Sequence, residues 1–344
     1  MKLGYTAGYW AAGPPAGIED AIAEAERLGF DSFWTAEAYG SDALTPLAWW
    51  GAATTRLKLG TSIAQLSART PAATAMAAMT LDHLSGGRFI LGLGASGPQV
   101  VEGWYGQPYN RPLERTREYV QIIRQIVARE TPVEFHGKQY DIPYDRPGST
   151  GLGKPLKSIV HPLRTEIPIY LGAEGPKNVA MAAEIADGWM PIFFSPKSDA
   201  YYRAALAEGF ARPNARRTID DFEVACAVAV IVDDDIERAA DTMRPQLALY
   251  IGGMGAREAN FHYEVFARMG YEAECSKIQD LFLDGQKREA VAAVPTRMVE
   301  DTALIGPAGK LKDELAEWER TVVTTLLVGG PPAILRQVAE IVGA

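Results

Sequence analysis

A glycine-rich turn from Gly172 to Lys177 has the residue types of an anion-binding site. The stretch YLGAEGPKNVAMAAEIADGW begins in an apolar strand, Ile167 to Leu171, passes through this turn and continues as a helix. Gly172 and Gly175 let the backbone approach another group closely, and Pro176 suits the first helical position. The N–H groups at a helix N-terminus attract anions, and Lys177 adds a positive charge. Tight packing of a strand on a helix, with no ligand, explains the same residues equally well.

A second glycine-rich turn, GLGASG from Gly92 to Gly97, also follows a predicted strand. Its spacing matches the G-x-G-x-x-G of dinucleotide-binding turns. That fingerprint requires a helix directly after the turn and an acidic residue about twenty positions further on. Here Gly103, Gly106 and Pro108 interrupt any following helix, and Arg117 lies in the middle of a later predicted helix. A glycine-rich strand end that lines the mouth of a barrel is the preferred interpretation.

Polar and aromatic residues gather where predicted strands end. Glu37 ends the second strand and could accept hydrogen bonds from a ligand or be a paired surface acid. Ser62 and Ile63 end the third strand, and Arg69 could pair with an anion or with Glu37. Aromatic side chains near these ends suit a flat aromatic ligand, although some belong to the core or to dimer contacts. They are Tyr9, Trp10, Tyr39, Trp49, Trp50, Trp104, Tyr105, Trp189, Phe193 and Phe194.

Motifs for several other chemistries are missing from the sequence. The four histidines, His83, His136, His161 and His262, do not have the spacing of metal ligands. His83 is interpreted as a favourable cation near the end of a helix. There is no G-x-S-x-G nucleophile turn and no phosphate-binding G-x-x-x-x-G-K-[ST] loop. The sequence therefore predicts no metal site and gives no support to a hydrolase.

The elements that position these residues alternate between short apolar runs and amphipathic helical runs. Such alternation predicts a parallel sheet. We expect an α/β fold, a single TIM-type (β/α)8 barrel domain over residues 1–344, with a doubly wound open sheet as the alternative. In a barrel, functional residues lie on the loops after the strands. The eight predicted strands begin near Lys2, Asp31, Leu57, Arg88, Ile167, Trp189, Phe222 and Thr321.

Two stretches interrupt the alternation and are predicted to be insertions. Residues 131–166 hold proline, glycine and scattered aromatic residues, and they are long for a loop. Long loops in compact domains are usually lids or binding loops, so we expect this stretch to form a lid. A second insertion is expected near residues 255–300.

The composition limits the location and the partners of the protein. The chain has 344 residues, 47% of them hydrophobic, and a net charge of −9, which argues against nucleic acid and anionic membrane surfaces as partners. The two cysteines, Cys226 and Cys275, show no paired spacing, which favours a reducing compartment. The longest apolar run, nine residues from Val224, is too short to span a membrane. We expect a cytoplasmic protein.

Three stretches resemble the bacterial luciferase-like superfamily, and the resemblance covers nearly the whole chain. They are GTSI at the end of the third strand, ARTPAATAMAAMTLDHLSGGRFILGLGASG from Ala68, and YLGAEGPKNVAMAAEIADGW. The chain resembles in particular the actinobacterial oxidoreductases that use the deazaflavin coenzyme F420. The segment TLDHLSGGR is specific for the superfamily but much less so for cofactor or substrate. The resemblance implies a TIM-type barrel with insertions, a homodimer, and a flavin or deazaflavin at the C-terminal face.

The same resemblance implies a set of cofactor-binding residues. A non-prolyl cis peptide at Ser62–Ile63 would support the reactive ring, and Glu37 would contact the ring system. The loop that meets the cofactor linker corresponds to Ala95, Ser96 and Gly97. Lys197 would supply a second positive charge. The turn that receives the phosphate corresponds to Gly172, Ala173, Glu174, Gly175, Pro176 and Lys177, with free N–H groups at Gly175, Lys177 and Asn178.

Two departures from the family pattern narrow the expected reaction. Related alcohol and sugar-phosphate dehydrogenases have a histidine and a glutamate where this chain has Ala38 and Pro98. Without these acid–base groups we do not expect alcohol oxidation. We expect hydride transfer between reduced F420 and a small organic substrate, with an F420 reductase as a reductant source. The proton donor is left open among Tyr39, Tyr105, His136 and Tyr140.

Two alternatives remain at this stage. One is an FMN-dependent luciferase-like monooxygenase that receives reduced flavin from a partner flavin reductase. The other is a non-catalytic deazaflavin-binding protein, because both acid–base side chains are missing. The sequence does not identify the substrate or the direction of the reaction.

Overall fold

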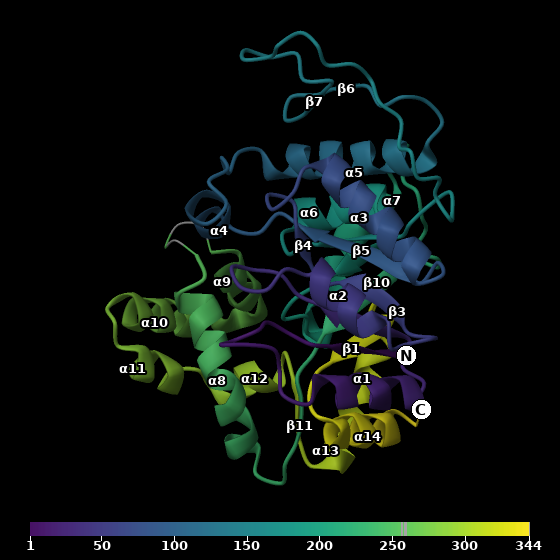
Figure 1. The fold of residues 1–344 in the computed structure, drawn as a ribbon. Coiled ribbons are helices and arrows are strands. Elements are labelled where there is room, and N and C mark those ends of the chain that lie inside the picture. The colour runs from purple at the N-terminus through teal and green to yellow at the C-terminus, as the bar shows by residue number, and fades with distance from the viewer. Residues whose placement is uncertain (256, 258–259, 344) are drawn as a thin grey trace.

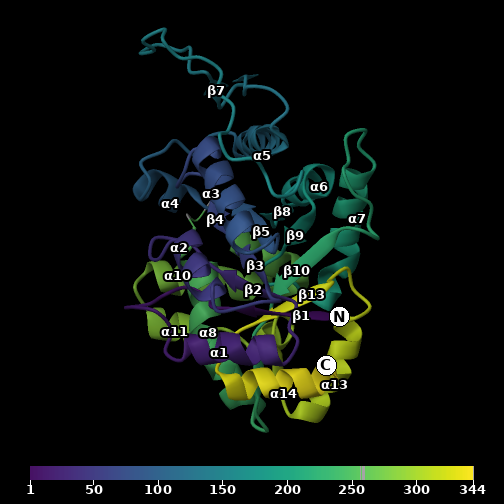
Figure 2. The same ribbon diagram turned by 45° about the vertical axis from the view of Figure 1, so that its right-hand side comes forward.

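The computed structural model describes residues 1–255, 257 and 260–343, and its centre is a closed barrel of parallel strands (Figures 1 and 2). Pairing of β3 with β5, at Leu59 with Phe89 and Gly60 with Ile90, closes the ring. The predicted barrel and its eight strands are confirmed, and the open-sheet alternative is wrong. The strands are β1 (Lys2–Thr6), β2 (Ser32–Thr35), β3 (Lys58–Thr61), β5 (Phe89–Gly94), β8 (Ile169–Gly172), β9 (Gly188–Met190), β10 (Glu223–Ala227) and β13 (Thr325–Val328).

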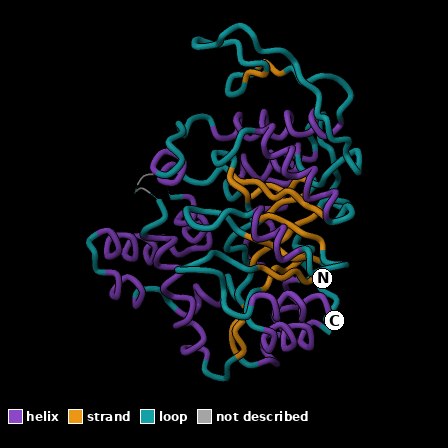
Figure 3. Tube along the Cα trace, viewed as in Figure 1, coloured by secondary structure: helices purple, strands orange, loops and turns teal. Residues whose placement is uncertain are grey.

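Helices surround the strands, as the tube drawing shows (Figure 3). They form where apolar residues recur at helical spacing, as at the buried Ile18, Ala21, Ile22 and Ala25 of the first helix. Thr70 caps the third helix by accepting a hydrogen bond from the N–H of Ala73. The surrounding helices are α1 (Ile18–Arg27), α2 (Leu44–Gly51), α3 (Pro71–Leu84), α5 (Pro112–Ala128), α6 (Pro176–Ile185), α7 (Asp199–Phe210), α13 (Ala308–Trp318) and α14 (Pro332–Val342).

The inside of the barrel is filled by one layer of large side chains. Trp34 and Tyr170 stack there with ring centroids 5.8 Å apart. The same buried cluster contains Ile90, Met190, Ala225 and Leu327, and Ile63 packs against it. Because these side chains fill the interior, the barrel is a packed core rather than a pore. Ile63 comes from the segment after β3, so it lies over the carboxyl end of this layer.

The predicted strand from Phe222 is two strands. The first, β10, belongs to the barrel, whereas β11 (Val230–Val232) leaves it and pairs with β12 (Leu304–Gly306). Between β11 and β12 lie α8 (Ile236–Gly252), α9 (Phe261–Phe266), η2 (Ala267–Tyr271), α10 (Glu272–Leu283), α11 (Lys287–Ala292) and α12 (Thr296–Glu300). These helices form a second buried core, to which Phe193 from the loop after β9 also belongs. The second insertion is therefore wider than the predicted 255–300, of which 256, 258 and 259 lie outside the described residues.

The segment 131–166 lies along the outside of α5. It contains a two-stranded ribbon, β6 (Phe135–His136) and β7 (Asp141–Ile142), and it projects beyond α5 at the top of Figure 1. The buried carboxylate of Glu118 on α5 accepts the N–H groups of Lys138, Gln139 and Tyr140. Further along, His83 at the end of α3 donates to the carbonyl of His161. These contacts do not support the predicted lid over the barrel mouth.

Candidate active site

The floor of the candidate site is Ile63, at the carboxyl end of the barrel. The Ser62–Ile63 peptide is cis, as predicted. A Cβ atom added to Gly94 would lie 2.7 Å from Ile63 Cδ1, and one added to Gly172 would lie 3.2 Å from Ile63 Cγ2. Glycine at the ends of β5 and β8 therefore makes room for Ile63 between the two strands. Just beyond, β4 (Ala64–Gln65) pairs with the end of β5 and fixes the loop that carries Ile63.

Glu37 and Arg69 form a buried ion pair beside this floor. Arg69 donates to both carboxylate oxygens of Glu37, at 2.9 and 2.8 Å, and the N–H of Gln65 donates to Glu37 Oε2 at 2.8 Å. Only 4% of Glu37 is exposed. The Glu37 carboxylate raises the pKa of the Arg69 guanidinium above its ordinary value. Of the two partners weighed for Arg69, the structure selects Glu37, and the carboxylate positions the loop from Ser62 to Thr70.

The turn after β5 brings Ala95, Ser96 and Gly97 to the same end of the barrel. Ser96 has a φ of 58°, in the left-handed region that few non-glycine residues adopt. A six-residue helix, α4 (Pro98–Gly103), follows directly, so the expectation that glycine and proline prevent a helix here is wrong. The interruption comes after Gly103. Tyr105 then donates to the carbonyl of Ala38 at 3.1 Å and joins this loop to the loop after β2.

The turn between β8 and α6 leaves open space in front of the helix. A Cβ atom added to Gly175, the N-cap residue, would meet nothing within 4 Å. The N–H of Asn178 donates to the carbonyl of Gly175 at 2.9 Å, so the prediction that it is free is wrong. Gly175 and Lys177 remain the candidate N–H donors of this turn, since Pro176 has none. Within the described part of the chain, the Lys177 ammonium makes no ion pair.

Lys197, by contrast, already has a partner. Its ammonium lies 2.6 Å from the carboxylate of Asp301, which also accepts a hydrogen bond from the hydroxyl of Tyr271 at 2.7 Å. Lys197 stands in η1 (Pro196–Ser198) after β9, whereas Asp301 follows α12 of the insertion. Because Asp301 neutralises Lys197, these contacts give no support to its predicted role as a second phosphate ligand.

A cluster at the mouth was missed by the sequence analysis. His262 Nδ1, on α9, lies 2.9 Å from Glu174 Oε1, in the turn after β8. The imidazole packs edge-on against Tyr250 and Phe193, with ring centroids 4.7 and 5.9 Å away. Tyr9, from the loop after β1, lies against Tyr250, and burial raises the pKa of both hydroxyl groups. His262 could not be recognised from the sequence, because a single histidine without metal-ligand spacing indicates no site. The one indication was Asn260, a residue type that caps helices, two positions earlier.

The four proposed proton donors divide into two groups. The imidazole of His136 is hydrogen-bonded to Asp141, 2.6 Å away, in the exposed ribbon outside α5. Tyr140 packs against Tyr119 of α5, with ring centroids 5.8 Å apart. Neither belongs to a loop that follows a barrel strand. Tyr39 and Tyr105 do, so these two remain at the mouth.

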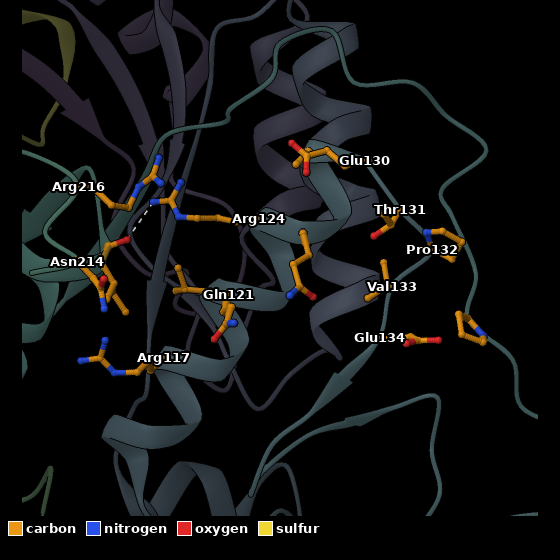
Figure 4. A pocket seen from close by; sticks show the side chains of 15 residues that line it. Arg117, Gln121, Arg124, Glu130, Thr131, Pro132, Val133, Glu134, Asn214 and Arg216 are labelled. Atoms are coloured by element: carbon orange, nitrogen blue, oxygen red, sulfur yellow. Dashed lines mark hydrogen bonds between the residues drawn. The ribbon is translucent and has the colours of Figure 1, made fainter.

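A large groove lies elsewhere on the molecule. It has a volume of about 1230 Å³ and runs between α5, the chain from Glu130 to Glu134, and the loop that carries Asn214 and Arg216 (Figure 4). No predicted site residue lines it. Each of the three arginines that line it already forms an ion pair with a carboxylate; Arg124, for example, lies 3.0 Å from Asp187. The groove is therefore separate from the candidate active site.

The fold and the mouth of the barrel define a luciferase-like protein. The family model for luciferase-like monooxygenases matches residues 3–325, so the chain belongs to this family. A Mycobacterium tuberculosis protein, provisionally named a coenzyme F420-dependent oxidoreductase, is 55% identical over 343 residues, which cover 99% of both chains. The 5,10-methylenetetrahydromethanopterin reductase of Archaeoglobus fulgidus is 28% identical, over 91% of this chain and 89% of its own length.

Solved structures share the same fold. The coenzyme F420-dependent tetrahydromethanopterin reductase of Methanopyrus kandleri superposes with a TM-score of 0.80 at 25% identity, covering 98% of this chain and 97% of its own. An F420-dependent secondary alcohol dehydrogenase reaches 0.74 at 18% identity over 99% and 97% of the two chains, a likeness that shows the fold alone. Among the described residues, no helix is long and apolar enough to cross a membrane, and no three metal-binding side chains gather.

Proposed function

We propose that this protein is a coenzyme F420-dependent oxidoreductase that transfers a hydride between the reduced deazaflavin and a small organic substrate. The observation that carries the proposal is the position of Ile63, an apolar side chain that packs on the cluster inside the barrel and lies between the glycines at the ends of β5 and β8. The 55% identity to the M. tuberculosis oxidoreductase, over the full length of both chains, supports the same cofactor.

The residues at the mouth fit such a cofactor. The ring would rest on Ile63, and Ala95, Ser96 and Gly97 would contact the linker. The phosphate would lie in the open space before Gly175, near the N–H groups of Gly175 and Lys177 and the Lys177 ammonium, which has no ion-pair partner among the described residues. When bound, reduced F420 supplies the hydride, while the protein orients the substrate and excludes water.

The direction of the reaction is proposed from two positions at the mouth. Ala38 and Pro98 carry no acid–base group, so removal of a proton from an alcohol has no base at either position. Reduction of a polarised C=C, C=N or C=O bond needs only a proton donor near the accepting group. Reduction of such a bond is therefore the proposed direction. Two solved monooxygenases that resemble this chain are 21% and 19% identical, a likeness that shows only the fold, so FMN chemistry is the alternative that the experiment tests.

We also propose a homodimer in the cytoplasm. Three large apolar side chains, Trp49 on α2 and Met76 and Leu84 on α3, are exposed on two neighbouring helices (Figure 1). Exposed apolar side chains on adjacent helices suit an isologous contact between two copies. Sedimentation equilibrium of the wild type and of Trp49→Glu tests this: the variant should be a monomer, and a monomeric wild type would refute the proposal.

The first experiment compares the binding of F420 and FMN to the apo-protein by fluorescence. It is followed by anaerobic oxidation of the reduced cofactor with a panel of ketones, imines and activated alkenes. Micromolar or tighter binding of F420 together with turnover of a panel member supports the proposal. Preferential FMN binding points to the monooxygenase and a partner flavin reductase. Tight F420 binding without turnover of any panel member favours the non-catalytic binding protein.

A further inference from the structure

A carboxylate and an imidazole from distant parts of the chain meet at the barrel mouth. Glu174 follows β8, and His262 lies on α9 of the insertion, with Nδ1 and Oε1 2.9 Å apart. The orientation of the ring does not make this contact a hydrogen bond. His262 Nδ1 and the other oxygen, Glu174 Oε2, are buried and have no hydrogen-bond partner among the described residues. Buried polar atoms without partners are rare in native proteins, and they mark a place where a ligand can supply the missing bonds.

The position of His262 is set by Asn260, the cap of α9. Asn260 Oδ1 accepts the N–H groups of His262 and Tyr263, at 3.0 and 3.1 Å. Its side-chain amide donates to the carbonyls of Tyr250 and Ile251, at 3.0 and 2.7 Å. One buried asparagine thus ties the start of α9 to the last turn of α8. The His262 ring is held between fixed elements rather than on a free loop.

The pair stands at the rim of the floor formed by Ile63. Gly172, which makes room for Ile63, precedes Glu174 by two residues. The Cα atoms of Gly172 and Glu174 therefore lie within about 7 Å of each other. Phe193, which packs on His262, follows β9, the neighbour of β8 in the barrel. A substrate bound above Ile63 would therefore lie next to Glu174 and His262.

We propose that His262 is the catalytic acid that protonates the substrate and that Glu174 is its positioning residue; this inference rests on the proposed F420-dependent reduction. As the accepting carbon gains a hydride from the reduced deazaflavin, the π electrons move to the neighbouring heteroatom or carbon. That atom forms a bond to the imidazolium proton of His262, and the N–H bond breaks. The imidazole is left neutral and regains a proton from water.

The tyrosine beside the imidazole is a weaker acid. Among the described residues, the titratable side chains in contact with His262 are Glu174 from the turn after β8 and Tyr250 from α8, and Tyr9 from the loop after β1 lies against Tyr250. Burial raises the pKa of Tyr250, so its hydroxyl holds its proton more firmly. Phe193 is apolar. The carboxylate of Glu174, 2.9 Å from His262 Nδ1, is placed to orient the imidazole toward the mouth.

The test combines two variants with a matched control. His262→Gln removes the acid, Glu174→Gln removes only the charge beside it, and His83→Gln changes a histidine at the far end of α3, bonded to His161. Unfolding midpoints in urea check that each variant folds. The F420 dissociation constant and the rate of anaerobic oxidation of reduced F420 with a ketone or enone probe are then measured.

We expect His262→Gln to lower the rate about 100-fold or more, the usual loss when a general acid is removed, with F420 affinity within about twofold of wild type. Glu174→Gln should lower kcat with little change in KM for the probe, because the imidazole loses the carboxylate beside Nδ1 that positions it. The histidine NMR signal of His262 should shift when oxidised F420 and the ketone are added, whereas the His83 signal should not. His83→Gln should behave as wild type.

Each result supports or overturns a specific claim. A wild type that does not bind F420, or reduces no probe, refutes the proposed function and this inference with it. A wild type that turns over a probe while His262→Gln is equally fast refutes the inference alone. If His262→Gln does not fold, kcat and KM of Glu174→Gln decide, and values equal to those of wild type overturn the role of the pair.

Discussion

Replacing Arg69 by methionine should destabilise the protein far more than the same replacement on the surface. Arg69 makes two charge-assisted hydrogen bonds to Glu37, at 2.9 and 2.8 Å, and its side chain is 21% exposed. Arg69→Met leaves the Glu37 carboxylate buried without its counter-charge, a loss that typically costs about 3–5 kcal/mol. Arg27, an exposed arginine paired with Glu24, is the matched control, and Arg27→Met should cost less than about 1 kcal/mol.

Replacing the other partner of the pair, Glu37, should destabilise the protein less. Glu37→Gln keeps an oxygen for the N–H of Gln65, and the freed guanidinium of Arg69 can turn to Asp42, 3.7 Å away, or to water. We expect it to cost roughly 1–3 kcal/mol. Urea unfolding at neutral pH gives the free energies of the two single variants and the double variant, whose coupling should be about 1–3 kcal/mol. A cost for Arg69→Met below about 1 kcal/mol, or no coupling, would refute the view that this pair holds the loop around Ile63.

Three further predictions follow from contacts at and below the mouth. Lys177→Ala should weaken F420 binding by about 1–3 kcal/mol, whereas Lys197→Ala, already neutralised by Asp301, should change it little; equal effects would contradict the assignment. Gly175→Ala, whose Cβ would enter open space, should leave the urea midpoint unchanged but reduce F420 affinity, and unaltered affinity would remove this turn from the site. Burial raises the pKa of Asp187, but the guanidinium of Arg124 and its other partners outweigh burial and hold the pKa below its ordinary value. Its contribution to stability is therefore present above about pH 4 and lost as the pH falls through the lowered pKa, so Asp187→Asn should reduce the difference in unfolding free energy between pH 6 and acid.

The sequence predicts the barrel well because local patterns determine its parts. A few consecutive residues are enough to recognise each of these patterns. They include short runs of β-forming residues, Thr70 and Pro71 at the start of a helix, and glycines at strand ends. The cis peptide at Ser62–Ile63 was also predicted, by resemblance, and is confirmed.

What the sequence could not provide was the pairing of side chains from different loops. Glu37 was expected to face a ligand, yet Arg69 and Gln65 already bind both its oxygens. Lys197 was assigned to the phosphate by resemblance, and its partner Asp301, from an insertion far along the chain, could not be foreseen. His262 was passed over for the same reason, since only folding brings it to Glu174. Such contacts depend on tertiary geometry and leave no periodic pattern.

The departure of β11 from the barrel has an evolutionary consequence. Strand β11 pairs with β12 outside the ring, and helices α8 to α12 lie between these two strands in the chain. The hydrophobic core of these helices is distinct from that inside the barrel. Changes in these helices can therefore accumulate without disturbing the strands that carry Ile63 and the glycine-rich turns. Since His262 belongs to this module and Ile63 packs on the cluster inside the barrel, the two sides of the mouth rest on different hydrophobic cores.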